Sequence, residues 1–487
     1  MKKGLILLLC LAAGFLLVSC TEPTNPTNKN ATPAATPIAA ASPLAAEEKA
    51  AIAQPVTLPV LDAFFADESF PALLKTRLQL TDDQIAKLKE LAHAETAKLS
   101  DANAGEVEGA TAKARESAEE KLKALLGEEK AGQLAILVRE RWSDAGEATT
   151  GKTAAATANP TTPEEFAARA PNTVPTDSRI VVNAPAYRMD VFDQGRLVKS
   201  YKIGIGYPQF PLPTALRKAR TIIFNPTWTP PDEPWVAKMA NIKVGEKVDA
   251  GSALNPLGPI KIPIGQPSLI HGGKSPAKLG TFASHGCVGL TTPQVRDFAK
   301  VLADISGAKL SDADLARYAR DKTQTKQLKL EKDVPVELRY ETIVAEDGKL
   351  HVYRDVYDQH TNTEENLREV LKANGLKLED LTAEEHAQVM DALAQMSGKS
   401  GASVARATPV AKQTPSPESS PGVAKAKAGA PLKKTPRAGK NQKEIVIEIA
   451  ALKGKGYPAP LNLDTGSGKA PPALAATKPE APPVAKP

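Results

Sequence analysis

The residues of this chain that could carry out nucleophilic chemistry gather in the stretch SHGCVGL, residues 284–290. It contains Cys287, the only cysteine beyond residue 20, with His285 two positions before it. A second histidine, His271, ends the apolar run LIH ahead of two glycines. A cysteine nucleophile needs a base to form the thiolate, because the thiol pKa is ordinarily about 8.5, and backbone N–H groups to hold the oxyanion. A histidine at a strand end and a cysteine at a glycine turn suit that chemistry, against the alternatives of a metal ligand or a buried core thiol.

The start of the chain indicates export. MKKGLILLLCLAAGFLLVSC has two lysines followed by an apolar run, which is typical of a secretory signal peptide over residues 1–20. Its end, LVSC, is similar to the lipobox of bacterial lipoproteins, where cleavage leaves the cysteine as a lipidated N-terminus. We therefore expect lipid on Cys20, and Thr21 in place of an aspartate favours the outer membrane, facing the periplasm, under the lipoprotein sorting rule. An ordinary signal peptide or a membrane anchor is the alternative.

Export limits what the cysteines can do. Cys10 would leave with the signal peptide and Cys20 would carry lipid, so Cys287 would have no intrachain partner in an oxidising compartment. This excludes a fold held by disulfide bonds and a zinc cluster built on cysteines. A lone exported thiol is a candidate reactive group.

Composition divides the rest of the chain into folded and unfolded parts. Residues 21–55, 151–176 and 398–487 are rich in Ala, Thr, Pro or Lys and have few large apolar side chains, so they cannot offset the entropy cost of folding. We expect a disordered tether, a linker and a disordered tail, the tail interrupted by one apolar stretch, EIVIEIAAL, at residues 444–452. The net charge of +6 is small, and the lysines of the tail favour a solvated spacer over a surface for an anionic polymer. No nucleic-acid partner is expected.

Residues 56–150 are predicted to be helical. Thr81 and Gln84 form a capping box, and apolar residues then recur on one helical face. Two more helices are expected around 113–127 and 128–142. The interpretation of this region is a helical spacer or a docking module.

The region from 177 to 360 has a different periodicity. RIVVNAPAYRMDVFDQGRLVKSYKIGIG alternates apolar and polar residues on either side of DQG at 193–195, which predicts a hairpin turn. Further short strands broken by Pro and Gly follow in TIIFNPTWTPP, NPLGPIKIPI, SLIHGG and VPVELRYETIVAEDGKLHVYRDVY. Helices are expected only near 293–304 and 311–320, so the domain is predicted to be mostly β, with a helical extension over 361–397 after it.

These residues together resemble the L,D-transpeptidases that have a YkuD-like catalytic domain. The family's signature is a His-Gly pair, a spacer, and then Ser/Thr-His-Gly-Cys followed by an aliphatic residue, and this chain has His271-Gly272 and then SHGCV from Ser284. The flanking segments NPLGPIKIPI and TWTPP are similar as well, and the closing segment VPVELRYETIVAEDGKLHVYRDVY is similar to that of the larger periplasmic members. The resemblance covers roughly residues 177–360 and implies a YkuD-like β-sandwich with short helices.

The resemblance also implies a role for each residue of the motif. Cys287 would be the nucleophile and His271 the general base, and later the acid, with the backbone carbonyl of Gly272 orienting the histidine. The backbone amides around His285, Gly286 and Cys287 would form the oxyanion hole. The side chain of His285 would shape the site rather than take the proton.

Two positions near the motif leave the site incompletely defined. Ser284 would hydrogen-bond within the turn or serve only as a structural turn residue. Most family members have an arginine two positions after the cysteine, where this chain has Gly289. That departure puts a contact to a substrate carboxylate in question, and Arg296 and Lys274 are the candidates to replace it.

The implied reaction is a two-step acyl transfer on peptidoglycan. The thiolate attacks the carbonyl that joins the diamino acid to D-alanine in a tetrapeptide stem, D-alanine leaves with a proton from His271, and a thioester remains. Attack by the amine of a second stem would form a crosslink, attack by a lysine of an outer-membrane protein would attach that protein to the wall, and attack by water would make an L,D-carboxypeptidase. No metal or diffusible cofactor is implied, since the histidines of the motif lack the further ligands of a zinc site.

Two alternatives belong to other functional classes. A non-catalytic lipoprotein could bind the wall through a degenerate domain, although the intact pair of His271 and Cys287 argues against it. A cysteine peptidase or amidase would release stem fragments without forming crosslinks. Carbapenems, which acylate the family's cysteine, would separate an activated thiol from a buried one.

Overall fold

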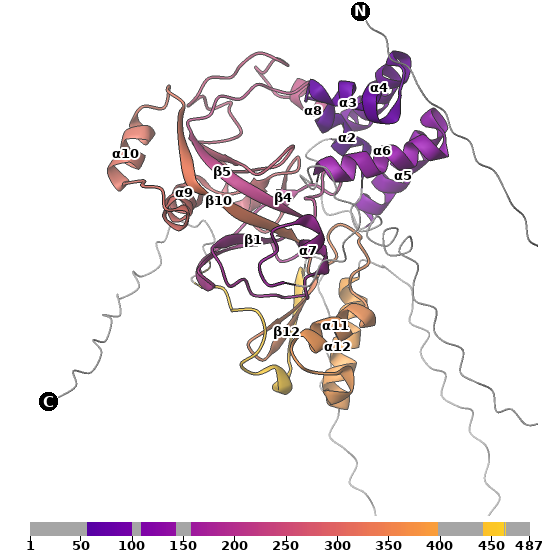
Figure 1. Ribbon diagram of the computed structural model, residues 1–487, viewed down its shortest axis with the longest axis vertical. Coiled ribbons are helices and arrows are strands. Elements are labelled where there is room, and N and C mark those ends of the chain that lie inside the picture. The colour runs from indigo at the N-terminus through magenta and orange to yellow at the C-terminus, as the bar shows by residue number, and fades with distance from the viewer. Residues whose placement is uncertain (1–55, 100–108, 143–156, 398–441, 462, 464–487) are drawn as a thin grey trace, which may run out of the picture. The chain divides into compact units, whose positions relative to one another are not determined.

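The computed structural model describes residues 56–99, 109–142, 157–397, 442–461 and 463, all within the compact unit Glu48–Pro487 (Figure 1). The predicted signal peptide, the lipidation site Cys20, the tether over 21–55 and most of the predicted tail lie outside the described residues. Among the described residues, no helix is both long enough and apolar enough to span a membrane.

The N-terminal part is helical, as predicted. Its helices are α2 (Leu58–Phe65), α3 (Ser69–Leu78), α4 (Asp82–Ala97), α5 (Ala110–Leu126) and α6 (Glu128–Trp142). The capping box of α4 is confirmed, because Thr81 accepts from the Gln84 amide and the Gln84 side chain accepts from the Thr81 amide. Buried side chains such as Phe64, Leu88 and Trp142 give this region a hydrophobic core of its own.

The central part is a curled sheet of eight strands, which confirms the prediction of a mostly β domain with short helices. After the short helix α7 (Pro163–Ala168), the strands run in the spatial order β3 (Arg196–Lys202), β2 (Arg188–Asp193), β1 (Arg179–Asn183), β10 (Lys326–Arg339), β5 (Ala215–Phe224), β6 (Ile260–Pro263), β7 (Leu269–His271) and β9 (Val288–Gly289). Two of these pairs, β1 with β10 and β7 with β9, are parallel, and the others are antiparallel.

The sheet curls because its last strand also bonds to a segment just beyond the first. Gly289 of β9 exchanges two backbone hydrogen bonds of 2.9 Å with Gly204, which directly precedes β4 (Ile205–Gly206). Strand β4 in turn pairs with β8 (Phe282–Ser284). The stretch 285–287, which contains Cys287, therefore lies between strands β8 and β9.

Helix α9 (Thr292–Ser306) packs against this sheet, and α10 (Asp312–Arg320) follows it, as the sequence predicts. The buried face of α9 presents Val295, Phe298 and Leu302 to the core. The predicted hairpin turn is also confirmed, since Gln194 and Gly195 both have positive φ, at 47° and 79°, and join β2 to β3.

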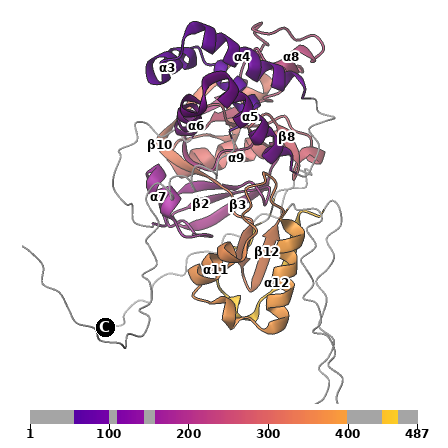
Figure 2. The ribbon, with the colours of Figure 1, turned by 90° about the vertical axis from the view of Figure 1, so that its right-hand side faces the viewer.

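A third part combines segments that are distant in sequence. Strands β11 (Ile343–Glu346), β12 (Lys349–Tyr353) and β13 (Glu444–Glu448) form an antiparallel sheet, on which α11 (Glu364–Ala373) and α12 (Ala383–Met396) pack (Figure 2). The structure differs here from the expected boundaries. Residues 343–353 leave the main sheet, and the apolar stretch inside the expected disordered tail supplies the third strand.

Candidate active site

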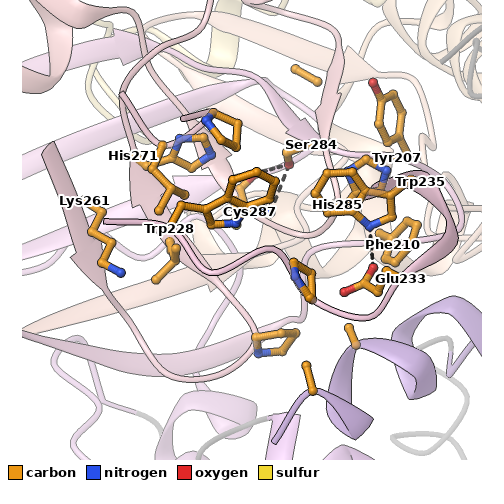
Figure 3. A pocket seen from close by; sticks show the side chains of 18 of the residues that line it. Tyr207, Phe210, Trp228, Glu233, Trp235, Lys261, His271, Ser284, His285 and Cys287 are labelled. Atoms are coloured by element: carbon orange, nitrogen blue, oxygen red, sulfur yellow. Dashed lines mark hydrogen bonds between the residues drawn. The ribbon is translucent and has the colours of Figure 1, made fainter. Parts of the chain in front are cut away.

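Strands β7 and β9 bring the predicted histidine and cysteine together. In their parallel register Ile270 pairs with Val288 and His271 with Gly289, so His271 is one diagonal step from Cys287, which directly precedes β9. Because side chains alternate between the two faces of a strand, His271 and Cys287 lie on the same face. Both line one cavity (Figure 3).

The turn that presents the cysteine is held by Ser284. The Ser284 hydroxyl accepts from the Cys287 amide at 2.9 Å and donates to the Cys287 carbonyl at 2.6 Å. Gly286 within this turn has a φ of 95°, a conformation that residues with a Cβ rarely adopt, so glycine is required there. Since the Cys287 amide is engaged with Ser284, the amides of His285 and Gly286 are the candidates for an oxyanion hole.

The imidazole of His271 is oriented by its neighbour Gly272. Nδ1 of His271 lies 2.8 Å from the Gly272 carbonyl oxygen, and because a carbonyl only accepts, the proton of the neutral ring is on Nδ1. Nε2 is then the nitrogen that can receive a proton. Gly272 itself is fixed, since its amide donates to the Ile260 carbonyl at 3.1 Å.

The cysteine and the histidine are both neutral in the resting site. Burial, followed by the charge of Lys274, lowers the pKa of His271 to about 3. Burial raises the pKa of the Cys287 thiol, although a backbone hydrogen bond from Leu269 and the charges of Lys274 and Lys261 oppose that increase. A thiolate would therefore form only as the proton passes to His271 during attack.

His285 is enclosed by aromatic rings. Trp235 stacks on the imidazole at 4.3 Å with an interplanar angle of 10°, and Phe210 and Tyr207 meet it edge-on at 4.8 Å and 5.2 Å. These contacts fix the backbone of the turn that carries Cys287. The arrangement is consistent with the predicted role of shaping the site.

An acidic residue of the site, Glu233, comes from the long connection between β5 and β6, which includes α8 (Pro234–Ala237). Trp235 Nε1 donates to a Glu233 oxygen at 2.5 Å. Burial raises the pKa of Glu233 to about 7, against the lowering effect of that hydrogen bond. Neither Glu233 nor Trp235 can be identified as a site residue from the sequence, because no local pattern connects this segment to the cysteine.

The cavity has a volume of about 870 Å³ and walls from two parts of the chain. The helical region contributes Ala63, Ala66 and Leu99. Lys238, on the wall from the β5–β6 connection, donates to the carbonyl oxygens of Ala97 and Leu99 at 2.7 and 2.6 Å. The helical region, predicted as a spacer or docking module, thus forms part of the pocket that contains the thiol.

Comparison with known proteins agrees with this geometry. Residues 177–326 match the family model described as the L,D-transpeptidase catalytic domain, YkuD. Residues 177–326 are therefore a domain of the YkuD type. No curated protein sequence matches the chain.

Solved structures similar to this chain include L,D-transpeptidases from three bacteria. The enzyme from Mycobacterium smegmatis is 13% identical, with 34% of this chain and 59% of that chain covered and a TM-score of 0.21. The catalytic domain from E. faecium is 15% identical, with 34% and 98% covered and a TM-score of 0.21. The enzyme from Mycobacterium tuberculosis H37Rv is 13% identical, with 34% and 58% covered and a TM-score of 0.19. This chain therefore spans little more than half of the length of the first and third of these proteins.

Two lysines of the L,D-transpeptidase domain lie in the cavity. Lys261 faces His271 across the β6–β7 pair, and Lys274 follows β7. Of the two residues that the sequence offered in place of the usual arginine, Lys274 lines the cavity, whereas Arg296 lies on α9 outside the lining. Within the described ranges, no group of three or more His, Cys, Asp or Glu side chains is placed to hold a metal ion.

Proposed function

We propose that this protein is an L,D-transpeptidase that acts on peptidoglycan tetrapeptide stems through a thioester on Cys287. Its products would be crosslinks between stems or proteins attached to the wall. The observation that carries the proposal is the position of His271 and Cys287 on one face of neighbouring strands, in one cavity of a domain that matches this family.

The neutral pair dictates the order of the proton transfers. As Sγ of Cys287 bonds to the scissile carbonyl carbon, its proton moves to Nε2 of His271, and the imidazolium is held by the carbonyl of Gly272. The oxyanion is stabilised by the amides of His285 and Gly286. When the C–N bond breaks, His271 returns the proton to the departing amine of D-alanine, and a thioester remains.

The second half-reaction reverses these steps with a new amine. The acceptor amine attacks the thioester and loses a proton to His271, and the C–S bond breaks as the sulfur of Cys287 takes that proton back. The acceptor is a second stem or a lysine of an outer-membrane protein. If water takes its place, the enzyme acts as an L,D-carboxypeptidase.

Export and anchoring are part of the same proposal. Lipid on Cys20 would place the enzyme at the outer membrane facing the periplasm, where both stems and outer-membrane proteins are available. Cys20→Ser should move the protein from the membrane fraction to the soluble fraction. A variant that stays with the membrane would contradict lipid anchoring.

The experiment that tests the activity is intact-protein mass spectrometry of residues 21–487, which include every described residue. Incubation with a carbapenem should give a covalent adduct on the wild type and none on Cys287→Ala. Incubation with tetrapeptide stems should release D-alanine and give crosslinked dimers. Release of D-alanine with a tripeptide as the only other product would indicate an L,D-carboxypeptidase. Cleavage of the stem into other fragments, without crosslinks, would indicate an amidase or peptidase. No reaction with either reagent would indicate a wall-binding lipoprotein.

A further inference from the structure

Strand β9 carries a glycine at a position where a side chain would face the substrate. Gly289 pairs with His271 and stands two residues after Cys287. Residues two apart on a strand share a face and are about 7 Å apart. A side chain at position 289 would therefore stand beside the thiol, on the same face.

The space above Gly289 is filled by the side chain of Lys274. A Cβ added to Gly289 would lie 2.8 Å from Cγ of Lys274, 3.0 Å from Cε and 3.4 Å from Cδ. The lysine begins next to this strand, because its amide donates to the Leu290 carbonyl at 3.0 Å. The aliphatic part of the Lys274 side chain thus lies across β9, in the space that the side chain of any residue other than glycine at position 289 would occupy.

The same wall of the cavity is positively charged. Lys274 and Lys261 both line the cavity, and Lys261 lies on the His271 side of it (Figure 3). The lining also contains two acidic residues: Asp67 pairs with Arg141, and Glu233 accepts a hydrogen bond from Trp235. The part of the cavity next to the thiol is therefore suited to an anionic group of the ligand.

We propose that Lys274 binds the terminal carboxylate of the donor stem and that Gly289 is the residue that makes room for it. The assignment deepens the proposed function and rests on it. In the donor, the carboxylate of the departing D-alanine is one residue, about 3.5 Å of chain, beyond the carbonyl that Cys287 attacks. The side chain of Lys274 lies over Gly289, about 7 Å along the same face from Cys287, so its ammonium group can reach this carboxylate. Lys261 adds a second positive charge to the same wall.

The test uses two donors that differ only in this charge. One is a tetrapeptide stem with a free C-terminal carboxylate, and the other is the same stem with a C-terminal amide. Acylation is measured without an acceptor amine, as thioester formed in the intact mass spectrum and as released D-alanine or D-alaninamide, so that only donor recognition is read. The wild type should favour the acid over the amide by about tenfold to a hundredfold in kcat/KM.

Lys274→Met should lose this preference, because its rate with the acid should fall by about tenfold or more beyond any change in its rate with the amide. The charge of Lys274 also acts on the pKa of Cys287, so some loss is expected with both donors and only the ratio of the two rates reports on carboxylate binding. Thioester formation with the amide shows that the variant is folded. Lys274→Arg should keep the preference, because the charge remains. Lys278→Met is the matched control, since Lys278 is an exposed lysine nearby on the same connection, and it should behave as the wild type.

A rescue variant tests the role of Gly289. In the Lys274→Ala background the space above β9 is empty, so Gly289→Arg should restore a positive charge beside the thiol and the preference for the acid. Gly289→Arg with Lys274 present should slow acylation by both donors, because the new side chain and that of Lys274 would occupy the same space.

Three results would overturn the assignment. If Lys274→Met and Lys274→Arg both lose acylation rate equally with the acid and with the amide, the lysine has only a structural role. If Lys274→Met keeps the preference for the acid, another residue recognises the carboxylate. A wild type that turns over neither donor would refute the proposed function, and the assignment would fall with it. A wild type that turns over both donors equally would refute the assignment alone.

Discussion

Gly272 packs so closely against α9 that an alanine there should displace the proposed general base. A Cβ at Gly272 would lie 2.6 Å from Cγ1 of Val295 and 3.3 Å from Cδ of Pro259. Ordinary contacts of this kind begin at 3.4 Å, so the two sides must separate by 3.4 − 2.6 = 0.8 Å. Val295 is fully buried in the main core and has little freedom to move.

This movement would displace His271, the proposed general base. The carbonyl of Gly272 holds Nδ1 of His271, so a shift of the strand turns the imidazole away from Cys287. A misplacement of about 1 Å in an active site can cost about a hundredfold in rate, and overpacking of a core costs about 1–3 kcal/mol of stability. We therefore expect Gly272→Ala to slow carbapenem acylation by about tenfold to a hundredfold.

The assay is the rate of adduct formation in the intact mass spectrum. Gly132→Ala is the matched control, because that glycine has open space around it in helix α6 and the change should leave the acylation rate unaltered. Val295→Ala removes the obstructing methyl groups, so the double variant should regain much of the lost rate, with a coupling energy of about 0.5–3 kcal/mol. Wild-type acylation by Gly272→Ala, or additive losses in the double variant, would refute the reasoning.

Three further outcomes follow from the hydrogen bonds and pKa shifts of the site. Ser284→Ala leaves the Cys287 amide without its acceptor, which should cost about 1–3 kcal/mol and slow acylation by about tenfold to a hundredfold, measured with the same adduct. Burial raises the pKa of Glu233 to about 7, so the acylation rate should show a step near pH 7 that depends on Glu233. Glu233→Gln should remove that step, and a step that stays unchanged in this variant would assign it to another group. Trp235→Phe removes a hydrogen bond that lowers the pKa of Glu233, so the step should move to higher pH, whereas an unmoved step would show that the bond is not formed in solution.

Features of the molecule that depend on neighbouring residues could be predicted from the sequence. The capping box at Thr81 and the hairpin at DQG depend on three or four consecutive residues, so their patterns are complete in the chain. The spacing of His271 and Cys287 beside glycines leaves a nucleophile and a core thiol as alternatives, and the resemblance of this motif to the L,D-transpeptidase signature favours the nucleophile. The helices around 113–127 and 128–142 were predicted from the glycine that separates them.

The walls of the site could not be predicted in this way. Lys261 reaches the cavity through the register of β6 against β7, and Trp235 reaches it by stacking on His285 from a connection without periodicity. The exchange of hydrogen bonds between Gly204 and Gly289 joins residues that are far apart in the chain. The choice of Lys274 over Arg296 likewise required a view of the space above Gly289. Each depends on contacts whose partners cannot be identified from local patterns.

The position of β13 has a consequence for how the protein is made. Until residues 444–448 have been synthesised, β12 presents an unpaired edge, and the buried side chains Ile445 and Ile447 are missing from the core beneath α11 and α12. The third part of the molecule therefore cannot complete its fold while the chain is still emerging, although the main sheet, which ends with β10, can. A ribosome that stalls after residue 397 would release a protein with a complete main sheet and an exposed, aggregation-prone strand.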